Sequence, residues 1–459
     1  MLRRDNRIVM SAPDDLKAIA DTPIRPLILP FQEFAERETS GGIVLLVCTA
    51  IALLWVNSPW AESYATLWHT KVVFGFAGQT LDHDLHFWVN DALMALFFLV
   101  VGLEIKRELL VGELSSVRQA ALPIVAAIGG VVVPALIYTS MNLGKKGAAG
   151  WGIPMATDIA FVIGVMALLG DRVPMSLKVF LTALAIVDDI AAVLVIAVFY
   201  TADLAWGGLA VAGGCALLLI VANRMGVRHP LPYALIGFVL WLAVLHSGVH
   251  ATIAGVVLAM TIPTRTELNS EELLRQIRTI LKHFERSASS QKSPLNNEEQ
   301  QVVIEALEDA CEKAQPPLHR FDKTLHPWVT FLIMPAFALA NAGVVLNGDI
   351  IGYLADPITV GVTLGLLLGK PLGIMLASWL AVKIGWADLP EGVTWTGIHG
   401  AAWLGGIGFT MSLFIGALAF SDQQLLARAK FGILVGSLLA GIVGSTILFR
   451  KDRTPEESA

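Results

Sequence analysis

The stretch AIVDDIAAVLVIAVFY (residues 185–200) places two adjacent acids, Asp188 and Asp189, inside an otherwise apolar run. A membrane-spanning helix needs about 20 mostly apolar residues, and residues 176–200 provide them. An ionisable group inside such a helix costs at least ~2.5 kcal/mol on insertion scales, so acids there are functional candidates by default. Two neighbouring carboxylates repel each other where the dielectric constant is low, so the pair binds a proton or a cation. The stretch therefore predicts a membrane helix with a site at which protons and cations compete.

The composition of the whole chain agrees with a membrane protein. Of its 459 residues, 55% are hydrophobic and only 15% are charged, whereas an ordinary soluble protein carries about 25% charged residues. A soluble core cannot hide this much apolar surface, so lipid must be the solvent for much of the chain. The net charge of -6 gives no sign of nucleic-acid binding. The spacing of the three cysteines indicates neither a metal site nor a disulfide framework, and no cofactor is predicted.

The same length criterion predicts an all-α polytopic membrane protein with about twelve spans. They cover roughly 41–56, 87–109, 120–140, 151–169, 176–200, 205–223, 232–246, 248–262, 328–346, 357–383, 396–418 and 426–449. Lysine and arginine are concentrated on the side of the chain's N-terminus, which predicts that both termini are cytoplasmic. The expected order is a cytoplasmic segment 1–40, spans 1–8 within 41–262, a cytoplasmic loop 263–326, spans 9–12 within 327–449 and a cytoplasmic tail 450–459.

Two segments outside the spans have patterns of their own. The outer loop 57–86 contains VVFGFAGQTLDHDL (residues 72–85), in which a β-branched and aromatic run, Gly-Gln and an alternating stretch follow one another and predict a small β-hairpin. The acidic inner loop has apolar residues at helical spacing over 273–284, after the cap-like Asn269-Ser270, and again over 302–310. These patterns predict two short amphipathic helices joined by the linker 287–297. A regulatory or partner-binding role and a merely solvated insertion both remain open for this loop.

Two spans are interrupted near their middle. In IPMATDIAFVIGVMALLG (residues 153–170), Pro154, Thr157 and Asp158 break the apolar run. In AAWLGGIGFTMSLFIGALAF (residues 401–420) the interruption consists of small and polar residues, namely Gly405, Gly406, Gly408 and Thr410. A proline kink in the first and close packing through small residues in the second are the alternatives to broken helices.

Spans 4 and 11 carry these interruptions, and each is the middle helix of a possible three-span repeat, spans 3–5 and 10–12. Paired interrupted segments of inverted-topology repeats mark the binding site of many transporters. Asp158 is then expected to neutralise the positive ends of the half-helices.

Further ionisable residues lie within or beside the spans. Lys370 in TLGLLLGKPLGIMLASWLA (residues 363–381) is flanked by apolar residues on both sides, so it needs an anion such as Asp188 or the negative half-helix ends, unless its side chain reaches the interface. Glu104 and Glu108 lie at the inner end of span 2, and Asp91 at its outer end is expected to line a polar region. The histidines near span ends, His246, His250 and His326, suit pH sensing, with capping or interfacial packing as the alternative.

Long strings of the chain resemble the NhaA-type sodium/proton antiporters of bacteria, over nearly its whole length. The matching strings are NDALMALFFLVVGLEIKREL (90–109), ATDIAFVIGVMALLGDRVP (156–174), LKVFLTALAIVDDIAAVLVIAVFYT (177–201), SGVHATIAGV (247–256), LHPWV (325–329), PAFALANAGV (335–344), GLLLGKPLGI (365–374), LPEGV (389–393) and GGIGFTMSLFI (405–415). This family has broken helices in inverted repeats.

The resemblance implies a role for each matching residue. Asp189 and Asp188 correspond to the carboxylates that exchange sodium and protons, and Lys370 to the lysine that pairs with Asp188. Thr157 and Asp158 correspond to the broken-helix residues beside the site. The expected funnel and pH-response residues are Glu104, Glu108, His250 and Asp322, the last of which stands where the family has a glutamate.

The resemblance also implies an activity and an assembly. The family exchanges sodium or lithium for protons electrogenically, is activated at alkaline pH, and forms homodimers through a hairpin that residues 57–86 would supply. The expected partners are therefore sodium ions, protons, the lipid bilayer and a second copy of the chain, in the bacterial inner membrane. The long acidic loop 264–326 departs from the family's usual pattern, and so does His246, which stands where a lysine is usual.

Three other classes of protein compete with an antiporter. A membrane enzyme with paired aspartates would need a G-x-G-D or D-D-x-x-D stretch, whereas the chain reads VDDIAAV, so no enzyme is predicted. A sodium-coupled solute symporter shares broken helices and remains the alternative. An open cation channel fits poorly with a buried lysine at position 370.

Overall fold

The structure is a computed structural model that describes residues 40–76, 79–201, 204–266, 268–288, 298–345 and 350–450. Most of the predicted N-terminal segment 1–40, of the linker 287–297 and of the tail 450–459 lies outside these ranges.

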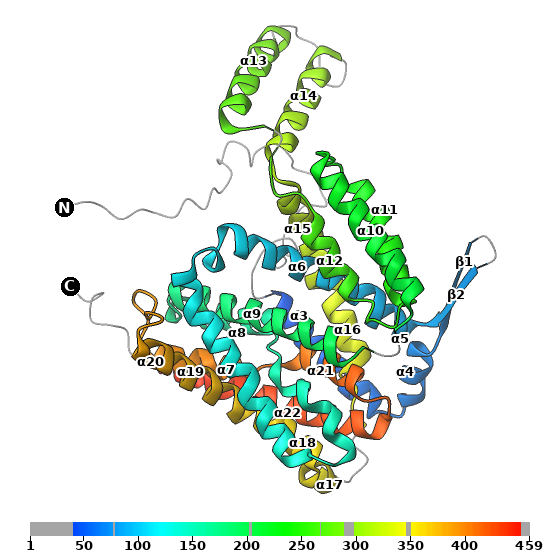
Figure 1. Ribbon diagram of the computed structural model, residues 1–459, viewed down its shortest axis with the longest axis vertical. Coiled ribbons are helices and arrows are strands. Elements are labelled where there is room, and N and C mark those ends of the chain that lie inside the picture. Colours follow the sequence, from blue (N-terminus) through cyan, green and yellow to red (C-terminus); the bar gives the residue numbers. More distant parts are fainter. Residues whose placement is uncertain are drawn as a thin grey trace.

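The described residues form a helical protein with one two-stranded sheet (Figure 1). The elements are α3 (Ser40–Val56), α4 (Ala61–Trp68), β1 (Lys71–Phe76), β2 (Gln79–Asp84), α5 (Leu85–Phe87), α6 (Met94–Val111), α7 (Val117–Asn142), α8 (Ile159–Leu169), α9 (Met175–Phe199), α10 (Trp206–Arg224), α11 (Pro230–Leu245), α12 (Ile253–Thr261), α13 (Ser270–Ala288), α14 (Glu298–Ala314), α15 (Pro317–Trp328), α16 (Met334–Asn341), α17 (Ile350–Ala355), α18 (Pro357–Leu364), α19 (Lys370–Ile384), α20 (Trp395–Leu404), α21 (Phe409–Ala419) and α22 (Gln423–Phe449).

Several helices have the length and the apolar surface of membrane-spanning helices. Within the described ranges, six are long and apolar enough to cross a membrane, and the number rises to nine if each of three bent helix pairs is one span. Large apolar side chains point outward from these helices; Leu136 on α7 is 63% exposed and Leu438 on α22 is 64% exposed. Because so many large apolar side chains on long apolar helices are stable at a surface when the solvent is lipid, the chain is a multi-pass helical membrane protein.

Two of the bent pairs lie where the sequence predicts interruptions. A 3₁₀ helix, Lys146–Met155, meets α8 at 41° across residues 156–158, and α20 meets α21 at 45° across residues 405–408. The extended segment 156–158 contacts the break between α20 and α21, because the N–H of Asp158 donates to the carbonyl oxygen of Ile407 at 2.7 Å. The backbone groups freed at the two breaks therefore bond partly to each other, which satisfies polar groups that lipid cannot hydrate.

Helices α7 and α19 pack closely against each other beside these breaks (Figure 1). A Cβ atom on Gly369 would lie 2.8 Å from the Cα atom of Pro134, so only glycine permits this approach. Small residues let membrane helices approach closely where the hydrophobic effect does not drive them together. A π-helical stretch, Gly365–Gly369, joins α18 to α19 and ends immediately before Lys370, and such stretches are frequent at functional sites.

The hairpin β1–β2 extends from the helical body (Figure 1). The strands are antiparallel, with Lys71 opposite Asp84 and Phe76 opposite Gln79. Gln79 is therefore part of the second strand, and the connection is residues 77–78, one position earlier than the Gly-Gln pair that marked it in the sequence; these two residues lie outside the described ranges.

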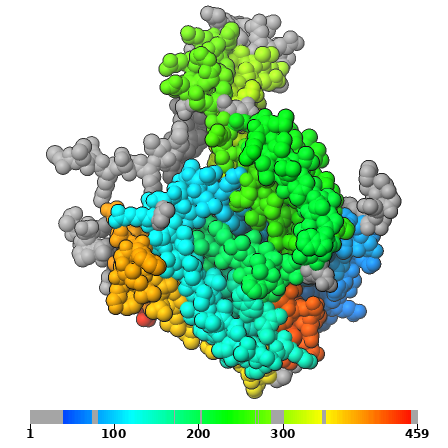
Figure 2. All heavy atoms as spheres, viewed as in Figure 1, coloured from blue at the N-terminus to red at the C-terminus, as the bar shows by residue number. Residues whose placement is uncertain are grey.

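Helices α13 and α14 pack against each other and project from the rest of the molecule (Figure 2). The side chain of Asn269 accepts a hydrogen bond from the N–H of Glu272 at 2.8 Å, which caps the start of α13. Leu274 on α13 and Val302 on α14 remain 54% and 63% exposed, so the apolar faces of this pair are only partly covered.

A buried ionisable cluster at the crossing of two bent helices

The central feature of the molecule is a group of ionisable side chains that are almost fully buried. Asp188 and Lys370 are 0% exposed, and Asp158 and Asp189 are 1% exposed. Thr157 and Thr410 are buried beside them. These residues come from α9, α19, α21 and the extended segment before α8, so the fold brings four separate parts of the chain together.

Asp188 has two protein partners on one carboxylate oxygen. Its Oδ2 atom accepts hydrogen bonds from the ammonium group of Lys370 and from the hydroxyl of Thr157, which lies 2.6 Å away. The same hydroxyl also lies 2.8 Å from the carbonyl oxygen of Gly405. Because a hydroxyl has a single proton, it donates either to Asp188 or to this carbonyl oxygen. The other oxygen of Asp188, Oδ1, is buried and has no hydrogen-bond donor among the described residues.

Asp189 has a different environment although it is the next residue. It lines a cavity of about 570 Å³, which Asp188 and Lys370 do not line. Its Oδ1 atom is buried and has no donor among the described residues. Adjacent residues of an α-helix point about 100° apart around its axis. For this reason one carboxylate faces the lysine and the other faces the cavity.

We call this space the central cavity. Its lining comprises Gly41, Gly42, Leu45, Phe97, Val100, Val101, Glu104, Arg107, Asp158, Ile159, Ala160, Ile163, Thr182, Ile186, Asp189, His319, Asp322, Lys323, His326, Pro327, Val329, Thr330, Met334, Thr410 and Met411.

Asp158 joins the two bent helix pairs. Its Oδ1 atom accepts from the N–H of Phe161 at 3.0 Å, which caps α8, and its Oδ2 atom accepts from the N–H of Thr410 at 3.0 Å, in the first turn of α21. The Thr410 hydroxyl also donates to Oδ2. One carboxylate thus satisfies the N-termini of two helices, whose dipoles favour a negative charge at this place.

The predicted glycines occupy positions without room for a side chain. A Cβ atom on Gly408 would lie 2.8 Å from the carbonyl oxygen of Ala156, and one on Gly406 would lie 2.5 Å from that of Leu366. Gly405 contributes its carbonyl oxygen to the Thr157 hydroxyl instead. The glycines therefore allow the α20–α21 break to contact the segment before α8.

The residues predicted to form a funnel and to respond to pH do not all lie together. Glu104, Asp322 and His326 line the central cavity, and the Oε1 atom of Glu104 lies 3.8 Å from the Nδ1 atom of His326. Glu108 instead lines a separate side cavity of about 450 Å³, where it accepts from the N–H of Glu113 at 3.1 Å.

His250 is part of neither cavity. Its Nε2 atom lies 3.8 Å from the Oδ1 atom of Asp91, and its Nδ1 atom lies 2.9 Å from the Thr252 hydroxyl. Asp91, at the outer end of span 2, is thus the acidic neighbour of this histidine.

Thr182 and Arg107 are two of the polar residues in the cavity wall that the sequence did not mark as candidates. Thr182 lines both the central and the side cavity, and Arg107 contacts the Oδ2 atom of Asp322 at 3.2 Å. Thr182 precedes Asp189 by seven residues, which is two helical turns, so the two residues lie on one face of α9. This helical spacing could have indicated Thr182 from the sequence. The partner of Arg107 lies 215 residues away in the sequence, and no local pattern indicates it.

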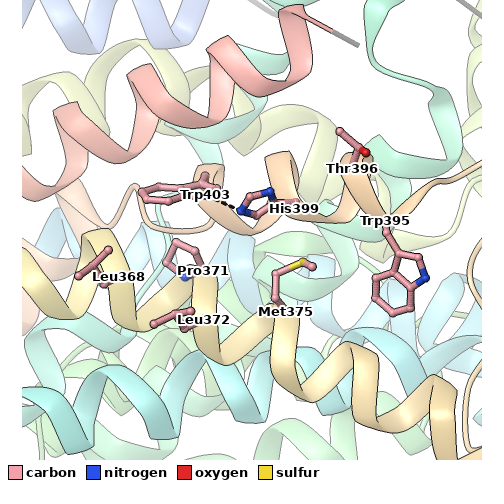
Figure 3. Close-up of a pocket in the computed structure, with 8 residues that line it drawn as sticks. All are labelled: Leu368, Pro371, Leu372, Met375, Trp395, Thr396, His399 and Trp403. Atoms are coloured by element: carbon pink, nitrogen blue, oxygen red, sulfur yellow. Dashed lines mark hydrogen bonds between the residues drawn. The ribbon is translucent and has the colours of Figure 1, made fainter. Parts of the chain in front are cut away.

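A groove outside this cluster has a different chemistry. It measures about 420 Å³ and runs along α19 and α20 (Figure 3). Its lining consists of Leu368, Pro371, Leu372, Met375, Trp395, Thr396, His399 and Trp403, and the Trp403 indole donates to the Nε2 atom of His399 at 2.9 Å. The lining includes no acid, so this groove does not resemble a cation site.

Helices with lipid-exposed faces, together with a buried cluster of acids and a lysine where two bent helix pairs cross, define a polytopic membrane protein of the kind that transports ions. The chain belongs to the Na+/H+ antiporter 1 family, whose model matches residues 32–448.

Curated relatives extend over nearly the same length. A protein of Koribacter versatilis called Na(+)/H(+) antiporter NhaA is 51% identical over 442 residues, which are 96% of each chain. Relatives with that name from Oleidesulfovibrio alaskensis and Acidithiobacillus ferrooxidans are 50% and 49% identical. They cover 97% and 93% of this chain, and 99% and 98% of their own.

Proposed function

We propose that this protein is a secondary antiporter that extrudes Na+ or Li+ in exchange for protons. The observation that carries the proposal is the contrast between two adjacent buried acids: Asp188 contacts Lys370, whereas Asp189 faces the central cavity. The names and the extent of the curated relatives support the same activity.

The charges of the cluster explain why such a site exchanges ions. Lys370 and Asp188 largely neutralise each other, so Asp189 is the carboxylate whose negative charge attracts a cation from the cavity. Hard cations prefer oxygen ligands. The Oδ1 atoms of Asp188 and Asp189 have no hydrogen-bond donor in the described part of the chain and suit this role, with the Thr157 hydroxyl beside them. A proton on Asp189 removes the charge that holds the cation, so loading one ion releases the other.

Movement of the site between the two sides of the membrane follows from the proposed architecture. We infer twelve spans in which α7–α9 and α18–α22 form inverted repeats, with a broken middle helix in each. The bends of 41° and 45° and the contacts between the two breaks support this arrangement. In such folds one unit rocks against the other around a site at the membrane midplane. A displacement of Asp158 relative to Thr410 would change which side the site faces.

The remaining features of the proposal concern location, assembly and regulation. We propose that the protein lies in the bacterial inner membrane with both termini cytoplasmic, and that it is an electrogenic exchanger that is more active at alkaline pH. Residues 57–86, which contain the β1–β2 hairpin, are proposed to join two copies. Glu104, Glu108, Asp322, His250 and His326 are proposed to adjust transport to pH.

Everted membrane vesicles test the exchange directly. Respiration acidifies their interior, and added Na+ is expected to dissipate the pH gradient that an acridine dye reports. Asp189→Asn is expected to abolish this response, because the neutral amide cannot alternate between a proton and a cation.

Asp388→Asn is the matched control, because Asp388 is 74% exposed and pairs with the exposed Arg118, unlike the buried acids of the cluster. It should behave like the unmodified protein. A full Na+ response in Asp189→Asn, or dissipation without any Na+, would reject the proposed function.

A further inference from the structure

Three side chains at the wall of the central cavity have the chemistry and spacing of a metal site. Glu104 on α6 and Asp322 and His326 on α15 each offer one ligand atom, and these atoms lie within 4.8 Å of one another. Asp322 and His326 are four residues apart on one helix, so both project from the same face. We propose that this cluster binds a divalent transition-metal ion, with Zn2+ as the best fit, and that the bound ion inhibits exchange.

The distances require little rearrangement. Zinc binds histidine nitrogen and carboxylate oxygen at about 2.0–2.2 Å, so two ligands of one tetrahedral ion lie about 3.4 Å apart. The Nδ1 atom of His326 and the Oε1 atom of Glu104 are already 3.8 Å apart. The ligand atoms of the three residues are separated by at most 4.8 Å. His326 is 58% exposed, so its ring can move to shorten the longer of these distances.

An unsatisfied oxygen is a second and independent sign of a ligand. The Oδ1 atom of Asp322 is buried and has no hydrogen-bond donor among the described residues. Its Oδ2 atom is held by Arg107 at 3.2 Å, which orients the carboxylate as outer partners of metal ligands do. An ion bound at Oδ1 would satisfy the free oxygen and leave the contact with Arg107 in place.

The donor set decides which metal is bound. One imidazole and two carboxylates suit Zn2+ and its transition-metal neighbours, with water in the fourth position. Mg2+ holds its water strongly and prefers oxygen ligands alone, so the histidine selects against it.

The inhibition follows from the position of the cluster. Glu104, Asp322 and His326 line the same cavity as Asp189, so a bound divalent ion would narrow that cavity and cancel the negative charge of the two carboxylates, which otherwise attracts Na+. This consequence rests on the proposed exchange activity, whereas binding of the metal does not.

Binding is measured by titrating ZnCl2 into the full-length protein in detergent, purified without a polyhistidine tag. Calorimetry is expected to show one zinc site that His326→Ala and Asp322→Asn each weaken by ~10-fold or more. His319→Ala is the matched control, because His319 lines the same cavity outside the cluster and should leave the affinity unchanged. Equal zinc affinity in all four proteins, or no binding at micromolar zinc, would overturn the site.

Inhibition is measured in everted vesicles, with each variant scaled to its own zinc-free rate. Zinc is expected to slow the Na+ response of the unmodified protein and of His319→Ala, EDTA to restore it, and His326→Ala to need ~10-fold more zinc. If calorimetry shows the site but zinc leaves a normal Na+ response unchanged, the inhibitory role is rejected. A missing Na+ response in zinc-free vesicles contradicts the proposed function instead.

Discussion

Asp158 and Thr410 are 252 residues apart in the sequence, yet the Asp158 carboxylate accepts hydrogen bonds from both the N–H and the hydroxyl of Thr410. Because Asp158 also caps α8, this contact connects the two bent helix pairs at their breaks. A movement of one bent helix pair would therefore displace the other through this contact.

Thr410→Val should weaken this connection while the backbone N–H contact remains. A hydrogen bond to a charged group contributes about 1.5–3 kcal/mol, so we expect a lower melting temperature in detergent and a several-fold higher Na+ concentration for half-maximal exchange. Thr410→Ser keeps the hydroxyl and should restore both. Thr446→Val removes an exposed hydroxyl on α22 and serves as the control; an equal effect there would argue against a special role for Thr410.

Removal of Lys370 should destabilise the protein more than removal of the whole pair. Lys370→Met leaves the Asp188 carboxylate buried without its cation, and breaking a buried pair in this way costs about 3–5 kcal/mol. The double variant Asp188→Asn/Lys370→Met has no charge at either position. Its melting temperature should therefore be closer to that of the unmodified protein.

Thermal unfolding in detergent gives this comparison as a double-mutant cycle. Lys383→Met on the same helix is the control, since its ammonium lies over the exposed ring of Trp379. Additive effects of the two single substitutions would contradict a direct pairing of Asp188 and Lys370.

Gly408→Ala should block the contact between the two breaks. Its Cβ atom would lie 2.8 Å from the carbonyl oxygen of Ala156, and backbone there has little freedom to move. We expect most of the Na+-dependent exchange to be lost, together with a lower melting temperature. Gly213→Ala on α10 meets nothing within 4 Å and should change neither. Normal exchange by a Gly408→Ala protein that is present at normal levels would show that the close approach is dispensable.

The β1–β2 hairpin should detach from the helices at low pH. Partial burial raises the pKa of Asp84, but the hydrogen bond from the Phe87 N–H at 2.9 Å and the neighbouring His69 and His86 outweigh it and lower that pKa below its usual value. A lowered pKa in the folded state means stability that is present above the unfolded pKa and lost as the pH falls through the folded value.

If the hairpin joins two copies, the dimer fraction measured by light scattering should fall as the pH drops below about 4, the ordinary range of an aspartate. Asp84→Asn should show a reduced dimer fraction already at neutral pH. Asp82→Asn is the control, because it loses the exposed pair with Lys71, which contributes about 0–1 kcal/mol. A dimer fraction that does not change with pH or in Asp84→Asn would contradict this assignment.

Much of the architecture could be predicted because its causes are local. Runs of about 20 apolar residues require lipid as their solvent, and backbone groups in lipid must bond within a helix. The insertion cost of Asp188, Asp189 and Lys370 marks them without any knowledge of the fold. The two interruptions were also visible as Pro154 and as the glycines after Leu404.

Other features depend on partners that are distant in the sequence. No local pattern separates Asp188 from Asp189; the packing of α19 against α7 places Lys370 beside the first, and the central cavity lies beside the second. The same holds for the place of Glu108 in a separate cavity and for the contact of Arg107 with Asp322.

The sequence by itself therefore determined that lipid surrounds much of the chain, that the protein is helical, and which ionisable residues lie within the membrane. These properties follow from hydropathy and insertion free energy, which depend on a few neighbouring positions. The family resemblance implied the pairing of Asp188 with Lys370, and the paired interruptions suggested Asp158 at the half-helix ends. Only the tertiary structure showed that Asp189 faces the cavity and which atoms make these contacts, because those relationships depend on the orientation of side chains between helices that are hundreds of residues apart in the sequence.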